Sequence, residues 1–199
     1  MILVGVSFND TLRGGTALVV DQRFRWARKF YRIVSRTDLL PSSPVSQSVA
    51  TIARIWADPQ LAESKRLFSQ DRRPAKTVRM RPRIVTSGSV LGGLLREQNV
   101  PVERIEPATT AGWKKRSMAG GLGNDYTVGT DMLKAVLEAV AAQQRIDRNS
   151  GALGFERLLH SAGSIIDERT HPNDSLVMAL ALAVWFRETV PYARPYRSV

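Results

Sequence analysis

The sequence contains no cysteine. That absence excludes disulfide cross-links, zinc-ribbon sites and a thiol nucleophile, and it fits a reducing compartment. Long apolar runs are also missing. The longest, Leu176 to Phe186, has 11 residues, whereas a membrane-spanning helix needs about 18 or more. The apolar start, residues 1–6, has neither a basic segment nor a small-residue cleavage site, so it predicts a β-strand and not a signal peptide.

Acidic residues are few relative to basic ones. The 199 residues include 29 Lys and Arg but 18 Asp and Glu, which gives a net charge of +11. This balance predicts a polyanionic partner, most often nucleic acid; the alternative is a solvated basic surface that serves only solubility. With 43% hydrophobic residues the chain can bury one sizeable core. We therefore expect a single domain over residues 1–190 and a polar tail over 191–199.

The basic residues are concentrated in three stretches, 23–36, 65–83 and 114–116. In the first, arginines alternate with aromatics, which indicates a strand, and prolines in the second indicate a loop entering a strand. The third follows Trp113 in a Gly-rich segment, 112–129, that predicts either a mobile loop tracking a nucleic-acid backbone or a plain surface loop. The predicted nucleic-acid-binding residues are Arg72, Arg73, Lys76, Arg79, Arg81, Trp113, Lys114, Lys115 and Arg116.

Hydrophobic periodicity and turn signals predict the order of secondary-structure elements. Strands are expected at 2–8, 16–21, 24–34, 83–86 and 102–105, and helices at 47–57, 87–98, 130–144, 154–160 and 173–187. Three strands followed by alternating helices and strands indicate an α/β fold, with a ribonuclease H-like mixed sheet of about five strands and helices on both faces. The last helix is apolar nearly all round and should be buried.

Four segments carry a resemblance to a known family. They are the hairpin formed by 4–6 and 15–20, the strand and helix 84–97, the segment 128–133, and the stretch His171 to Trp185, in which His and Asp precede a Leu/Ala helix with a Trp. These segments resemble the nuclease domain of phage terminase large subunits, and the last is the most specific. A Gly-x-x-x-x-Gly-Lys phosphate loop is missing from the sequence, so the ATPase half of a terminase is not represented.

The resemblance implies phosphodiester hydrolysis by two Mg²⁺ or Mn²⁺ ions, held by carboxylates from the first strand, the central strand and the start of the last helix. The matching positions are Ser7, Thr86, Asp174 and Ser175, of which only Asp174 is acidic. Asp10 can replace Ser7 if it swings in from the loop. Asp174 is alternatively a helix-start residue stabilised by the helix dipole. His171 either orients a water or a phosphate or is a turn residue.

Three functions follow from these observations. The first is a phage-type nucleic-acid-binding protein with a terminase-nuclease-like fold and weakened or lost cleavage. The second is an active Mg²⁺- or Mn²⁺-dependent endonuclease in DNA packaging or processing, with Asp174 and Asp10 as catalytic residues. The third is a phage structural or assembly protein that reuses the fold. Double-stranded DNA is the expected partner, with phage packaging or virion proteins as the alternative, no membrane, and the host cytoplasm or the virion as the location.

Overall fold

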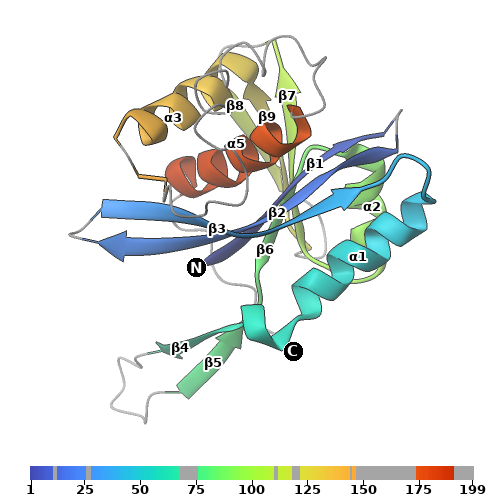
Figure 1. Ribbon diagram of the computed structural model, residues 1–199, viewed down its shortest axis with the longest axis horizontal. Helices are drawn as coiled ribbons and strands as arrows, with labels where there is room; N and C mark the ends of the chain where they lie inside the picture. Colours follow the sequence, from blue (N-terminus) through green and yellow to red (C-terminus); the bar gives the residue numbers. More distant parts are fainter. Residues whose placement is uncertain are drawn as a thin grey trace.

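The computed structural model describes residues 1–10, 13–25, 28–67, 76–109, 112–117, 122–143, 145–146 and 174–190. Its centre is a seven-stranded sheet in the order β3-β2-β1-β6-β7-β9-β8 (Figure 1). The strands are β1 (Ile2–Asn9), β2 (Gly14–Arg25), β3 (Arg28–Leu39), β6 (Arg83–Thr86), β7 (Val102–Ala108), β8 (Trp113–Ser117) and β9 (Asn124–Gly129).

The sheet is mixed. β1, β2 and β3 form an antiparallel meander, whereas β6 runs parallel to β1, β7 parallel to β6, and β9 parallel to β7. The edge strand β8 pairs antiparallel with β9. A separate hairpin is formed by β4 (Glu63–Leu67) and β5 (Lys76–Met80). The long meander strands therefore lie on one side of β1, and the shorter parallel strands on the other.

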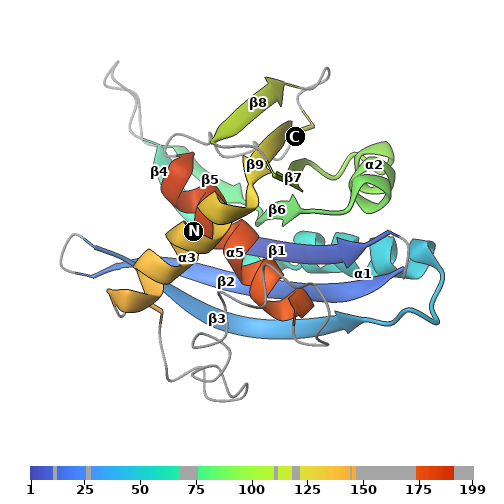
Figure 2. The same cartoon turned by 90° about the horizontal axis from the view of Figure 1, so that it is seen from above.

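Helices cover both faces of the sheet (Figures 1 and 2). On one face lie α1 (Val45–Ala57), which leads into the short 3-10 turn Pro59–Leu61, and α2 (Ser89–Glu97); on the other lie α3 (Thr130–Ala142) and α5 (Asp174–Thr189). Each face has its own apolar cluster because successive residues of a strand point to opposite sides. Thus Leu3 packs with α5, and Val4 packs with α1 and α2. The expected α/β class, with a mixed sheet and helices on both faces, is confirmed.

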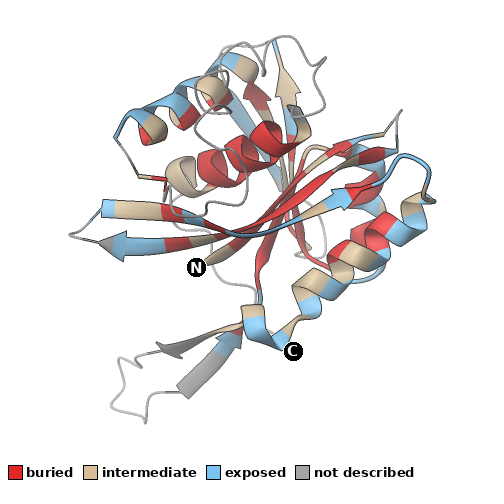
Figure 3. Cartoon of the chain, viewed as in Figure 1, coloured by how far each residue is buried: buried red, intermediate tan, exposed pale blue. Residues whose placement is uncertain are grey.

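The last helix is buried, as its apolar run predicted (Figure 3). Every residue from Leu176 to Phe186 is buried against β1, β2 and α3. The helix backbone packs directly on Gly5 of β1, where an added Cβ would stand 2.0 Å from the carbonyl oxygen of Ala179. Small side chains on both elements are therefore what allow α5 to rest on the strand backbone.

Three expectations need correction. The sheet has seven strands, not about five, because Trp113–Ser117 and Asn124–Gly129 are strands where the Gly-rich segment 112–129 predicted a loop. Tyr126 and Val128 of β9 are buried in the α5 cluster, and that packing fixes the segment. The third strand begins at Arg28, not at residue 24, because β2 continues to Arg25. The expected helix 154–160 and the tail 191–199 lie outside the described residues.

Candidate functional site

Hydroxyl side chains form a row across β1 and β2 next to the start of α5. Ser7 is paired in register with Thr16 of β2, and Thr16 is paired with Asp38 of β3. Directly opposed residues lie on the same face of a sheet, and here that face is the one covered by α5, because the Thr16 and Ser175 hydroxyl oxygens are 2.7 Å apart. The structure therefore brings together Ser7 and Ser175, two of the residues that the resemblance selected.

Asp38 is a carboxylate at this row that the sequence did not reveal. Its Oδ1 accepts hydrogen bonds from Arg36 Nε at 2.8 Å and from Thr16 Oγ1 at 3.4 Å. Because the Thr16 hydroxyl has one proton, donation to Asp38 makes Ser175 the donor to Thr16. The result is a directed chain from Ser175 to Asp38, in which the carboxylate is already neutralised by Arg36.

Thr86 lies on the opposite face of the sheet. It pairs in register with Val6, whose side chain belongs to the cluster under α1 and α2. The Thr86 methyl group faces Gly92 of α2, and its hydroxyl accepts from the Gly88 N–H at 3.2 Å. Thr86 therefore supports the turn into α2 and does not point toward Ser7.

Asp10 also serves the start of α2. Its Oδ2 accepts from the N–H of Ser89 at 3.0 Å, the Ser89 hydroxyl at 2.9 Å and the N–H of Val90 at 3.3 Å. Carboxylates at this position satisfy the free N–H groups of a helix start and interact favourably with its dipole. The loop thus delivers Asp10 to α2, away from the row formed by Ser7, Thr16 and Ser175.

The described residues do not provide the ligand set of a two-metal site. Among them, no three His, Asp or Glu side chains are grouped so that they can hold a metal ion. At the ends of β1 and β6 the side chains are hydroxyls, Ser7 and Thr86, which supply no charge to balance divalent cations. Asp174 is the first residue of α5, but its side chain lies outside the described part, as do His160 and His171.

The predicted nucleic-acid-binding residues are distributed over two edges of the molecule. Arg72 and Arg73 lie outside the described residues, as does the side chain of Lys76 in β5. Arg79 and Arg81 are exposed, and the Arg81 guanidinium lies 4.1 Å from the centre of the Trp56 ring. On the edge strand β8 three successive cations are exposed: Lys114, Lys115 and Arg116.

Trp113 anchors this basic edge strand to the core. Its ring centre is 5.9 Å from that of buried Trp185 in a T-shaped contact and 6.1 Å from that of Tyr126. Even so, 40% of Trp113 is exposed. The cations of β8 are therefore held on a fixed strand beside a partly open aromatic ring, which is the combination that binds nucleic-acid backbones and bases.

Asp125 of β9 lies behind β8 and is not free to bind a ligand. Its carboxylate accepts from Arg96 at 2.7 Å and from Arg104 at 2.9 Å. Burial alone would raise its pKa, but the hydrogen bonds and charges of the two arginines outweigh burial and lower the pKa of Asp125. Asp125 instead ties α2 to β7 and β9.

Comparison with known proteins adds no assignment: no family model, no curated protein and no solved structure matches the chain. Of the helices that the structure describes, none is long and apolar enough to cross a membrane.

Proposed function

We propose that the protein binds nucleic acid through exposed cations at the edge of a terminase-nuclease-like sheet, with cleavage weakened or lost. The observation that carries the proposal is β8, where Lys114, Lys115 and Arg116 are exposed in succession next to Trp113. The net charge of +11 supports the same reading. Cations on a fixed strand neutralise phosphates at a smaller entropic cost than cations on a mobile loop.

The strand order supports the ribonuclease H-like part of the proposal. An antiparallel meander, β1 to β3, is followed by β6 and β7, which continue the sheet parallel to β1 on its other side. That arrangement is the one expected of the ribonuclease H-like element order. The α5 start then lies beside the end of β1, where the resemblance puts the last acidic position.

The loss of cleavage is supported by the chemistry of that place. Ser7 and Ser175 carry hydroxyl groups where the resemblance expects carboxylates. Thr86 faces α2, and Asp10 accepts hydrogen bonds from the first N–H groups of α2. Asp38, the carboxylate nearest in register, is paired with Arg36. Since Thr86 and Ser7 face opposite sides of the sheet, acidic residues at these two positions would not share one ion.

Salt-dependent binding to duplex DNA tests the proposal. If six to eight phosphates are neutralised, affinity falls roughly 10³-fold or more between about 50 and 200 mM salt. Reversing two charges on β8, by Lys114→Glu with Lys115→Glu, should weaken binding. It should also reduce the dependence of affinity on salt by the equivalent of about two phosphate contacts. The matched control is Arg32→Glu with Arg54→Glu, which changes the net charge equally at exposed positions away from β8.

Three results would contradict the proposal. Equal weakening by the β8 pair and the control pair would mean that only net charge matters. Robust Mn²⁺-dependent nicking of a plasmid, abolished by Asp174→Asn, would identify an active nuclease. Absence of binding at low salt would instead favour the assembly function with an acidic protein partner.

A further inference from the structure

The β2–β3 hairpin extends beyond the rest of the sheet as a two-stranded ribbon. Pairing of β1 with β2 ends at Ile2 opposite Asp21, whereas β2 and β3 remain paired from Gln22 opposite Tyr31 to Arg25 opposite Arg28. Residues 22–25 and 28–31, called the ribbon here, therefore project past the start of β1 (Figure 1). They include the cations Arg23, Arg25, Arg28 and Lys29.

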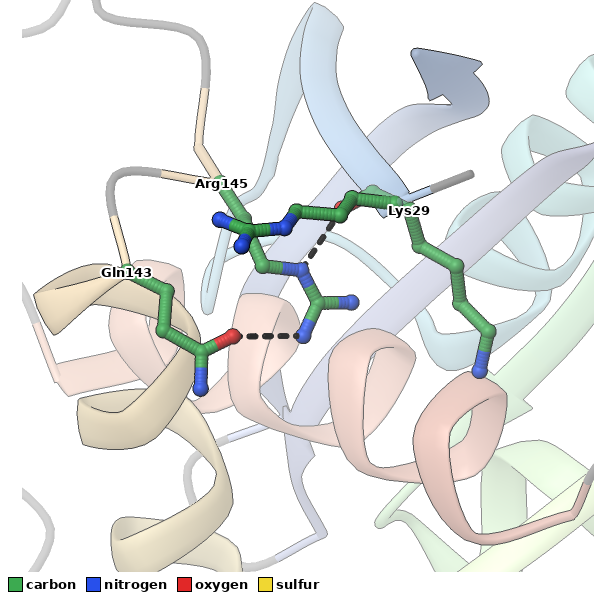
Figure 4. A pocket seen from close by; sticks show the side chains of 4 residues that line it. Lys29, Gln143 and Arg145 are labelled. Atoms are coloured by element: carbon green, nitrogen blue, oxygen red, sulfur yellow. Dashed lines mark hydrogen bonds between the residues drawn. The ribbon is translucent and has the colours of Figure 1, made fainter. Parts of the chain in front are cut away.

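An open pocket of about 500 Å³ lies beside the β3 strand of the ribbon (Figure 4). It is lined by Arg28, Lys29, Gln143 and Arg145. The segment after α3 closes one side, because the Tyr31 N–H donates to the Arg145 carbonyl at 2.8 Å and Ile146 forms a bridge to Tyr31. The volume is in the range of small-ligand sites, about 300–1,000 Å³.

Two cations of the pocket, Lys29 and Arg145, are held in place by Glu188 before any ligand binds. Arg145 donates from Nε to the Lys29 carbonyl at 2.7 Å and from Nη1 to Gln143 Oε1 at 3.3 Å, and it pairs with Glu188. Burial alone would raise the pKa of Glu188, but hydrogen bonds from Tyr31 and Arg145 and the nearby cations lower it, so this carboxylate is ionised at neutral pH. Three cations thus meet one anion, which leaves positive charge for a bound anion.

An exposed aromatic ring stands next to the pocket. Phe24 is directly opposite Lys29 in register, so the two side chains lie on the same face of the ribbon, about 5 Å apart at Cβ. Phe24 is 65% exposed, the highest value among the large hydrophobic residues exposed in the described part of the chain. A cationic pocket beside an exposed ring matches a nucleotide, which has a phosphate next to a flat base.

We propose that the pocket binds a phosphate group of a nucleic-acid strand and that Phe24 stacks on an unpaired base of the same strand. This inference rests on the proposed function and adds to it a second contact, on the edge opposite β8. It also specifies single-stranded nucleic acid at this contact, because the base of an intact duplex does not offer its face to a side chain. A free phosphate or nucleotide shares the same chemistry, and the experiment below separates the two sources.

The test compares a dT oligonucleotide with a duplex by fluorescence anisotropy on the full chain. Phe24→Ala should weaken oligonucleotide binding by about 5- to 140-fold, the equivalent of one lost stacking contact, and leave duplex binding unchanged. Arg28→Gln should weaken oligonucleotide binding and reduce the salt slope by about 0.7. Matched controls are Arg32→Gln, an exposed cation of β3 that does not line the pocket, and Val34→Ala, an exposed aliphatic side chain.

The outcomes distinguish this inference from the proposed function. If Phe24→Ala and Arg28→Gln bind the oligonucleotide as tightly as the wild type, while the β8 variant loses duplex binding, the pocket inference is overturned and the proposed function stands. An abasic oligonucleotide should be insensitive to Phe24→Ala; equal sensitivity would remove base stacking from the account. If inorganic phosphate shifts the Arg28 and Gln143 amide NMR signals but no oligonucleotide binds, the pocket is a small-anion site and the nucleotide assignment fails.

Discussion

In the middle of the sheet, α5 approaches β1 so closely that Gly5 has no room for a Cβ atom, whereas the outer regions at β3 and β8 carry exposed cations and aromatic rings. The middle of the sheet is specified by close packing and by the buried ion pair of Arg83 with Glu103, so it tolerates little change. The outer strands need only pair along one side, so their exposed positions are available for binding. The comparison predicts that equivalent changes will act on stability in the middle and on affinity at the edges.

The largest expected effect comes from the buried ion pair between Arg83 of β6 and Glu103 of β7. Their charged atoms are 3.0 Å apart, and their side chains are 6% and 1% exposed. Glu103→Gln leaves the Arg83 charge without its counterion in the core and should cost about 3–5 kcal/mol of unfolding free energy. Urea denaturation measures this loss.

The matched edge variant is Asp38→Asn, which breaks the Arg36–Asp38 pair at 2.8 Å. That pair is partly solvent-exposed, so its loss should cost less than about 1 kcal/mol. If Glu103→Gln and Asp38→Asn lowered the free energy of unfolding equally, burial would not explain the difference between the middle of the sheet and its edge.

The next effect concerns the contact between Gly5 and α5. Gly5→Ala places a Cβ 2.0 Å from the Ala179 carbonyl oxygen, so the helix must move away from the strand. We expect a loss of about 3 kcal/mol, at the upper end for overpacking. Gly93→Ala is the control, because Gly93 is exposed on α2 and an added Cβ there meets nothing within 4 Å. It should stabilise the protein by about 0.5–1 kcal/mol. A neutral Gly5→Ala in thermal denaturation would refute the close approach.

Smaller than the losses at Glu103 and Gly5 is the pH-dependent contribution of Asp125, which lies between the middle of the sheet and the β8 edge. Its pKa is lowered in the folded state, so its contribution to stability is present above the unfolded pKa, near 4, and is lost as pH falls below that value. Asp125→Asn should cost about 1–3 kcal/mol at pH 7. The difference from the wild type should shrink at pH 3, and a constant difference across this range in urea titrations would exclude this contribution.

The elements predicted most accurately from the sequence are those whose own hydrophobic pattern is clear. β1 and α5 have clear apolar patterns, and both appear close to the expected bounds. β8 and β9 were missed because Gly112 and Gly123 resemble loop residues and because three successive cations show no alternation. These strands form because Trp113 packs on Trp185, which is 72 positions away in the sequence and invisible to local patterns.

The candidate site was predictable in part for a similar reason. The resemblance located Ser7 and Ser175 at one place, because the end of β1 lies beside the start of α5 in this order of elements. The resemblance did not reveal that Thr86 faces α2. Neighbouring residues of a strand point to opposite faces of the sheet, so an error of one residue in the match reverses the face. Asp38 was missed because its register with Thr16 follows a bulge at Val34 of β3, opposite Val19 and Val20.

The three cations of β8 have one more consequence, which concerns contacts between copies of the chain. A strand at the edge of a sheet presents unpaired backbone groups to which a second molecule can add its own strand, and charged side chains there oppose such pairing. Because like charges repel when two β8 strands approach, Lys114, Lys115 and Arg116 keep the protein from self-association through this edge. Replacing them with neutral residues would therefore promote aggregation and weaken binding together, whereas replacement with glutamates keeps the edge repulsive and leaves a change in affinity that can be measured.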